Sequence, residues 1–200
     1  MNSIQFWTRA TVIFVIAAWC VFALIFLLRK RPKETGPPAK RESAASWGIF
    51  MKGLAYGMVW FAGPRRGGTR PMFDNMPLAG QIAIALLAAV IAAASVWLVL
   101  ISVRTLGRQW AVQARLIEGH RLIVEGPYRW MRNPIYTGMF GMLIATGLAF
   151  ATWWMLLGGI VLYLIGFTIR VRAEEKLLLS QFGPEFEEYK RQVPALLPRL

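Results

Sequence analysis

Two polar stretches, residues 107–136 and residues 169–194, contain most of the residue types in this chain that could do chemistry. The first combines charged, aromatic and glycine residues with the only histidine, His120. In the second, Arg170 and Glu174 are four residues apart, so on a helix their side chains share one face. Such an arginine could hold an anion through two parallel hydrogen bonds, whereas an ion pair at a helix end is the simpler interpretation.

The segment between these stretches must bring them together. Residues 133–169 contain no charged side chain over 37 positions. That length is too great for one ordinary membrane crossing of about 20 residues, but it suffices for two short ones with a tight turn near residues 150–153. A helical hairpin returns the chain to its starting side. Small residues recur along it and predict close helix packing: Gly138, Gly141, Ala145, Gly158, Gly159 and Gly166.

The composition indicates a polytopic membrane protein, because 56% of the residues are hydrophobic, 13% are aromatic and the mean hydropathy is +0.47. The formal charge is +13, but the basic residues flank apolar segments and form no basic stripe, so we expect no nucleic-acid partner. The single cysteine, Cys20, excludes a disulfide framework or a cysteine metal site within one chain. We expect no metal.

Three further segments could cross the membrane: residues 10–28, 43–64 and 75–103. The second contains Lys52 and could instead lie in the interface as an amphipathic helix. If it spans, the fold is all-α with about five transmembrane helices, and the basic loop 29–42 shares one side with both polar stretches. That side then carries most of the 23 basic residues, which predicts that it faces the cytoplasm. The cost is that Arg65, Arg66 and Arg70 lie on the opposite side.

Two motifs carry a family resemblance: GPYRWMRNPIYTG at residues 126–138 and RVRAEEKLLLSQFGPEFEEYKRQVP at residues 170–194. They resemble the isoprenylcysteine carboxyl methyltransferases, integral membrane enzymes that use S-adenosylmethionine. The resemblance covers residues 105–198. It implies N-terminal transmembrane helices at residues 1–104, followed by a catalytic region at residues 105–200 with a cytosolic cofactor pocket.

The resemblance also implies roles for individual residues. Arg170 would contact the methyl acceptor and, with Glu174, form the catalytic pair. Asn133 stands where the family commonly has histidine; its amide can hold a cofactor but cannot carry a proton charge. The family's cofactor contacts fall on Gln113, His120, Arg121, Leu122, Ile123, Tyr128, Asn133, Pro134, Ile135, Tyr136 and Glu174.

The residue chemistry suits this role. A carboxylate acceptor with an ordinary pKa near ~4 is already ionised at neutral pH, so methyl transfer needs alignment more than acid–base catalysis. Tyr128 and Tyr136 stand beside Pro127 and Pro134, and their rings could enclose an adenosine or belong to the interfacial aromatic belt. Glu175 points about 100° away from Glu174 on a helix, which predicts a structural role.

Several functions remain open from the sequence. The acceptor could be a prenylated cysteine or prenylated peptide reached from the membrane lipids, a small thiol, or a phospholipid amine. A membrane sterol-type reductase using NADPH has a similar C-terminal layout and is the alternative enzyme class. A membrane scaffold without catalysis is the third possibility.

Overall fold

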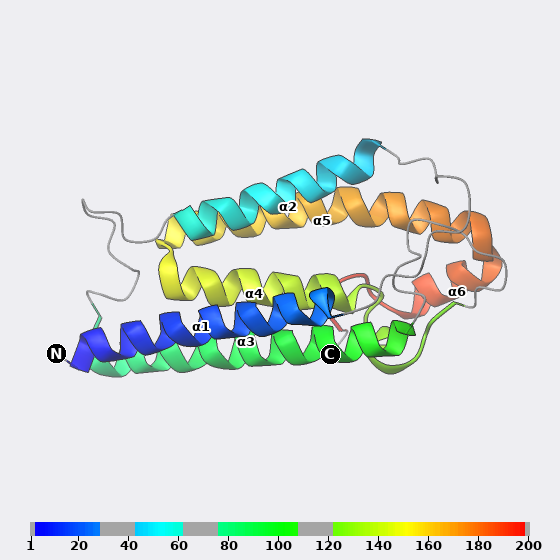
Figure 1. Ribbon diagram of the computed structural model, residues 1–200. Coiled ribbons are helices and arrows are strands. Elements are labelled where there is room, and N and C mark those ends of the chain that lie inside the picture. The colour runs from blue at the N-terminus through cyan, green and yellow to red at the C-terminus, as the bar shows by residue number, and fades with distance from the viewer. Residues whose placement is uncertain (1–2, 29–42, 62–75, 108–121, 199–200) are drawn as a thin grey trace.

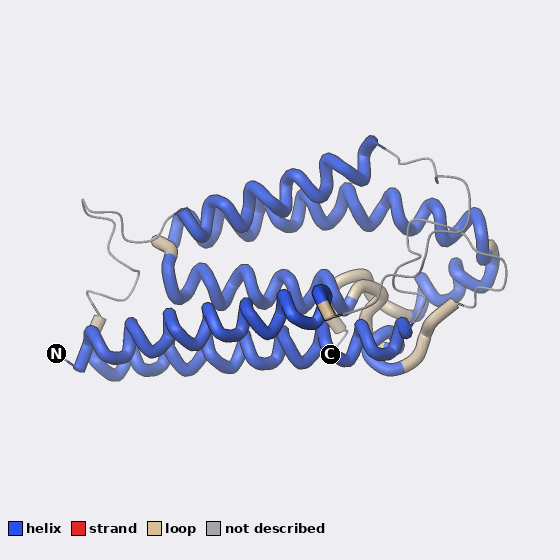
Figure 2. Tube along the Cα trace, in the orientation of Figure 1, coloured by secondary structure: helices blue, strands red, loops and turns tan. Residues whose placement is uncertain are grey.

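The structure, a computed structural model, describes residues 3–28, 43–61, 76–107 and 122–198. Every regular element within these ranges is helical (Figures 1 and 2), in agreement with the predicted all-α class. The elements are α1 (Ser3–Leu27), α2 (Ser43–Phe61), α3 (Leu78–Leu106), the short 3-10 helix η2 (Gly126–Arg129), α4 (Pro134–Phe150), α5 (Trp153–Phe182) and α6 (Pro184–Gln192).

The five long helices run alternately in opposite directions (Figure 1). The pair α2 and α5 forms one layer, α4 lies beneath it, and α1 with α3 forms the other side. Consequently α3 and α5 finish, and α4 begins, at the same end of the bundle, where η2 and α6 also lie. We call this end, with residues 122–134 and 169–198, the polar end. The predicted hairpin is confirmed, with its turn at Ala151 and Thr152.

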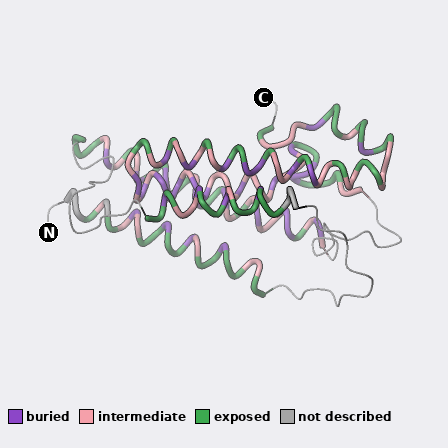
Figure 3. Tube along the Cα trace, turned by 90° about the horizontal axis from the view of Figure 1, so that it is seen from above, coloured by how far each residue is buried: buried purple, intermediate pink, exposed green. Residues whose placement is uncertain are grey.

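Among the described helices, three are long and apolar enough to cross a membrane: α1 over Arg9–Leu27, α3 and α5. The apolar α4 is shorter, with 17 residues, and α2 carries Lys52 within its 19 residues. The outward faces of α1, α2, α3 and α5 expose large apolar side chains, as expected for surfaces in contact with lipid. Figure 3 shows how exposed and buried residues alternate along the helices. The chain is therefore a membrane protein.

Glycines set the closest helix contacts. A Cβ atom placed on Gly48 of α2 would lie 2.7 Å from the carbonyl oxygen of Gly166 of α5, and one placed on Gly166 would lie 2.8 Å from the carbonyl oxygen of Gly48. Gly138 of α4 packs against α3 in the same way, because a Cβ atom placed on it would lie 2.9 Å from the carbonyl oxygen of Ser95. The prediction of close packing at Gly138 and Gly166 is confirmed, and these contacts fix α4 and α5 against the N-terminal helices.

Hydrogen bonds between helices satisfy polar groups inside the bundle. Trp19 of α1 donates from Nε1 to the hydroxyl oxygen of Thr146 of α4 at 2.9 Å. Tyr56 of α2 donates to the carbonyl oxygen of Met139 at 2.6 Å, and Tyr163 of α5 donates to that of Tyr136 at 2.7 Å. Because lipid offers no alternative partners, such bonds favour one arrangement of α1, α2 and α5 around α4.

Candidate active site at the polar end of the bundle

Two local features of the sequence position the predicted pair and its neighbours. Helix α5 continues past its last apolar turn to Phe182, so Arg170 and Glu174 stand one above the other on it. Helix α4 begins at Pro134, whose fixed backbone angle suits a first helical position, and Tyr136 lies in its first turn. Gly183, with a φ of 50°, ends α5, as the glycine in this position predicts.

Arg170, Glu174 and Tyr136 form one hydrogen-bonded unit. Glu174 accepts at Oε1 from Arg170 Nε at 2.6 Å and from the Tyr136 hydroxyl at 2.9 Å. Arg170 Nε also lies 3.3 Å from the hydroxyl oxygen of Tyr136. The side chains of Arg170 and Glu174 are 21% and 13% exposed, so their charges interact with little screening by water. The predicted ion pair is therefore present, and Tyr136 joins it from α4.

Lys52 of α2 is also part of this site and was not predicted from the sequence. It is 5% exposed, and its ammonium lies 3.7 Å from the centre of the Tyr136 ring. No hydrogen bond or ion pair joins Lys52 to another described residue. Burial of an unpaired ion costs several kcal/mol, whereas a cation–π contact returns about 0.5 to 2 kcal/mol. The available signal was a lone charge in an apolar helix, which often marks a functional site.

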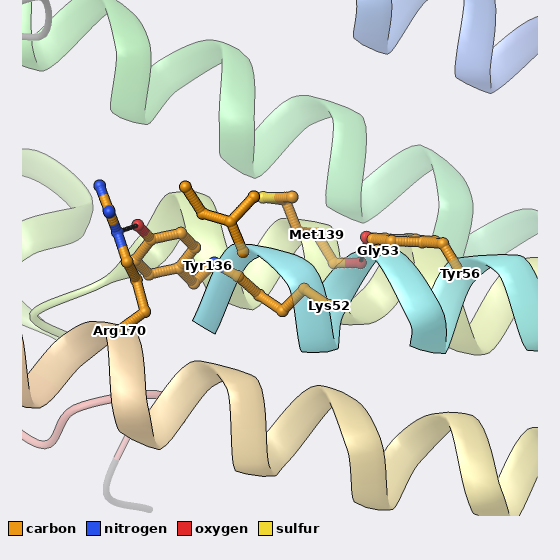
Figure 4. A pocket seen from close by; sticks show the side chains of 7 residues that line it. Lys52, Gly53, Tyr56, Tyr136, Met139 and Arg170 are labelled. Carbon is orange, nitrogen blue, oxygen red and sulfur yellow. Dashed lines mark hydrogen bonds between the residues drawn. The ribbon is translucent and has the colours of Figure 1, made fainter. Parts of the chain in front are cut away.

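A pocket of about 350 Å³ lies between α2, α4 and α5 (Figure 4). Its walls are mostly apolar, and Lys52 and Arg170 place two cations beside the Tyr136 ring. The pocket can therefore accommodate a ligand that combines an apolar part with an anionic group. The lining residues are Ile49, Lys52, Gly53, Tyr56, Tyr136, Met139 and Arg170.

Glu175 belongs to a separate cluster that holds the C-terminal segment. Its Oε1 is 2.6 Å from Arg132 Nη2, and its Oε2 is 2.7 Å from Lys190 Nζ. Arg132 also donates to the carbonyl oxygens of Lys190 and Val193. Glu175 is thus structural, as predicted.

The motif around Asn133 contacts the same segment. The Asn133 side-chain amide donates to the carbonyl oxygen of Ala195 at 3.0 Å, and the hydroxyl of Thr137 donates to that of Leu196. Pro134 is fully buried and Ile135 is half-buried. In this structure these residues shape the base of the polar end, next to the unit formed by Arg170, Glu174 and Tyr136.

Tyr128 lies in η2 and is 5% exposed. Its carbonyl oxygen accepts from the Tyr189 hydroxyl of α6 at 2.6 Å. Burial raises the pKa of Tyr189 well above its ordinary value, so this hydroxyl keeps the proton that it donates. The half-buried Leu122 and Ile123 precede η2. The three other predicted cofactor contacts, Gln113, His120 and Arg121, lie outside the described residues.

Within the described ranges, no group of three or more His, Cys, Asp or Glu side chains could hold a metal ion. The chemistry described around the pocket is that of the Glu174 carboxylate, the Lys52 and Arg170 cations and the phenol groups of Tyr56 and Tyr136. It can bind and orient charged ligands.

Comparison with known proteins gives consistent matches over the C-terminal half. The sequence profile of the phospholipid methyltransferase family matches residues 83–185. The chain is similar to protein-S-isoprenylcysteine O-methyltransferase from Xenopus laevis, with 34% identity over 87 residues, covering 44% of this chain and 30% of the relative. It is also similar to the enzyme of that name from Saccharomyces cerevisiae, with 33% identity over 100 residues, covering 49% of this chain and 42% of the relative.

A third relative is named for metal resistance and not for methyl transfer. The chain is 35% identical over 107 residues to the cobalt-zinc-cadmium resistance protein CzcN from Cupriavidus metallidurans, covering 50% of this chain and 46% of the relative. The chain spans less than half the length of each of these three relatives.

Proposed function

We propose, since the chain belongs to the phospholipid methyltransferase family, that it transfers a methyl group from S-adenosylmethionine to the carboxylate of a lipophilic acceptor, such as a C-terminal prenylated cysteine. One observation carries the proposal: Arg170, paired with Glu174 and Tyr136, lines a largely apolar pocket in a membrane protein. The names of the Xenopus and Saccharomyces relatives support the same acceptor class.

The residues at the polar end suit the cofactor. S-adenosylmethionine supplies a methyl group on a sulfonium, which needs no further activation. The Glu174 carboxylate would accept hydrogen bonds from ribose hydroxyls or from the amino group. The apolar, half-buried Leu122 and Ile123 and the ring of Tyr128 would contact the adenosine. Gln113, His120, Arg121 and the block Asn133, Pro134, Ile135 and Tyr136 complete the proposed cofactor contacts.

Arg170 would bind the acceptor carboxylate. Its planar guanidinium stays charged at a membrane boundary and can hold both oxygens of a carboxylate, a geometry that lysine cannot reproduce. The carboxylate would be ionised already, so the contribution of the enzyme is to remove water from it and to aim one oxygen at the methyl carbon. The entropic part of such alignment can be worth on the order of 7 kcal/mol.

We further propose that all five long helices cross the membrane and that the polar end faces the cytoplasm. The basic residues near the polar end support this orientation through the positive-inside preference. In this arrangement residues 1–104 supply membrane helices and the α2 wall of the acceptor pocket, and residues 105–200 supply the cofactor site and the rest of the pocket. The acceptor reaches the pocket from the lipid, and the cofactor reaches it from the cytosol.

A phospholipid amine is the second candidate acceptor, and the description of the matching family favours it. An amine of this kind is cationic at neutral pH, however, and Lys52 and Arg170 would repel it from the pocket. The charge of the pocket therefore favours the carboxylate.

The test is to purify the protein in detergent, titrate it calorimetrically with S-adenosylhomocysteine, and assay methyl transfer to N-acetyl-S-farnesylcysteine, to a small thiol and to phosphatidylethanolamine. Arg170→Lys should lower transfer to the farnesylcysteine about tenfold or more while the affinity for S-adenosylhomocysteine stays within a few-fold. Arg172→Lys, an exposed position on the same helix, is the matched control. Absence of S-adenosylhomocysteine binding by the unmodified protein would exclude the proposed class. Full activity of Arg170→Lys on the carboxylate would exclude the role of Arg170.

A further inference from the structure

We infer that Lys52 is a second anion-binding residue for the methyl acceptor, and that Gly53 beside it leaves room for the acceptor's hydrocarbon part. The inference rests on the proposed function and adds the wall of the site that α2 contributes. Neither residue belongs to the motifs at residues 126–138 and 170–194.

The charges of the pocket carry the first half of the inference. Lys52 and Arg170 both line it, and the Glu174 carboxylate is already bound to Arg170 and Tyr136. Among the described residues, the ammonium of Lys52 forms no hydrogen bond or ion pair, and it faces the Tyr136 ring. Within the part of the chain that the structure describes, Lys52 is thus a buried cation that no carboxylate approaches within ion-pair distance. An acceptor carboxylate shared between Lys52 and Arg170 would balance it.

The position of Lys52 suits a ligand contact. Figure 4 shows its side chain extending from α2 toward the Tyr136 ring, while Arg170 approaches Tyr136 from α5. Both cations therefore meet at one aromatic side chain, and an anion beside that ring would lie between them.

The space next to Lys52 carries the second half. A Cβ atom placed on Gly53 would meet no atom within 4 Å, although Gly53 lines the pocket. The neighbouring Ile49 is 56% exposed, so the opening adjoins apolar surface. The occupant predicted by these features has an anionic head and an apolar tail, which describes a lipidated carboxylate better than a small polar acceptor.

The open space at Gly53 allows a test that does not disturb packing. Gly53→Leu would add a side chain to the pocket wall at a position where its Cβ meets no described atom within 4 Å, whereas Gly57→Leu is a matched control one turn further along α2. A Cβ at Gly57 meets its nearest neighbour, Phe61 Cδ2, only at 4.0 Å, and Gly57 does not line the pocket. Lys52→Met removes the charge at similar length, and Lys52→Arg retains it.

For each variant we would measure the affinity for S-adenosylhomocysteine, the kcat and KM for N-acetyl-S-farnesylcysteine, and the inhibition constant of its carboxamide. Lys52→Met should raise KM about tenfold to a hundredfold, the range expected for losing one charge-assisted hydrogen bond. The inhibition constant of the carboxamide and the affinity for S-adenosylhomocysteine should stay within threefold. Lys52→Arg should restore most of the loss. Gly53→Leu should weaken the carboxylate and the carboxamide alike, and Gly57→Leu should weaken neither.

The outcomes separate the inference from the function on which it rests. A KM within twofold of the unmodified value in Lys52→Met, with cofactor binding intact, would overturn the role of Lys52. Equal effects of Gly53→Leu and Gly57→Leu would overturn the placement of the acceptor tail. If the unmodified protein binds no S-adenosylhomocysteine, the methyltransferase function itself fails, and this inference fails with it.

Discussion

Glu174 and Glu175 are neighbours in sequence with different surroundings in the fold. Glu174 bonds to Arg170 and Tyr136 beside the pocket, and Glu175 bonds to Arg132 and Lys190 under the C-terminal segment. The spacing from Arg170 predicted the first contact, because residues four apart share a helix face. The partners of Glu175 could not be predicted, since Arg132 is 43 residues away and the two meet only through tertiary packing.

We expect Glu174→Gln to weaken S-adenosylhomocysteine binding about ten- to a hundredfold, because one charge-assisted hydrogen bond contributes roughly 1.5 to 3 kcal/mol. Glu175→Gln should leave this affinity within a few-fold and instead lower the free energy of unfolding by about 1 to 3 kcal/mol, since a shielded ion pair is broken. Calorimetric titration and thermal unfolding in the same detergent separate the two effects. Equal losses of affinity in both variants would contradict the assignment of Glu174 to the cofactor.

Lys52 is a residue of the site that the sequence did not predict. In the sequence it interrupts an apolar segment, and this is equally consistent with an interfacial helix. Its functional meaning depends on Tyr136, which is 84 positions later and on another helix. Only the packing of α2 onto α4 and α5 brings the two together.

At the scale of elements, each helix of the hairpin packs more against an N-terminal helix than against its hairpin partner: α4 against α3, and α5 against α2. Small residues on α4 and α5 predicted close contacts, and the structure has them. The partner helices could not be predicted, because a glycine leaves room for any neighbour. The geometry between Arg170 and Tyr136 thus depends on helices that contain none of the family motifs.

We therefore expect Gly166→Leu to destabilise the protein by at least about 1 to 3 kcal/mol and to reduce S-adenosylhomocysteine binding in proportion to the folded fraction. The new side chain would overlap the backbone of α2 at Gly48. Thermal unfolding measures the loss, with Gly57→Leu as the control that adds the same side chain in open space. A Gly166→Leu protein as stable as this control would show that α2 and α5 can separate.

At the scale of the whole molecule, the uncharged segment 133–169 predicted a hairpin that places the two polar stretches on one side. The alternating directions of the five long helices agree with this arrangement (Figure 1). Among the described helices, length and composition identify α1, α3 and α5 as candidate spans. They do not identify α4, which is short, or α2, which contains Lys52. The sequence predicted the hairpin well because its limits are marked by charge, and it predicted α2 less well because its single lysine has two explanations.

Sidedness can be measured with single cysteines in a Cys20→Ala background. We expect Arg129→Cys and Glu185→Cys, both exposed at the polar end, to react with a membrane-impermeant maleimide from the same side of sealed vesicles. Met76→Cys, exposed just before α3, should react from the opposite side. Labelling of all three from one side would contradict the five-crossing arrangement.

The glycines of α2 also have a consequence for how this protein could diversify. Gly48 contacts the backbone of Gly166, so no other residue fits there, whereas Gly53 faces open space five positions later. A lineage could therefore exchange residue 53 freely without losing the fold. Because glycine is the smallest residue, each exchange would shorten the space for a lipid tail by an amount set by the new side chain, so single substitutions at position 53 would select shorter chains.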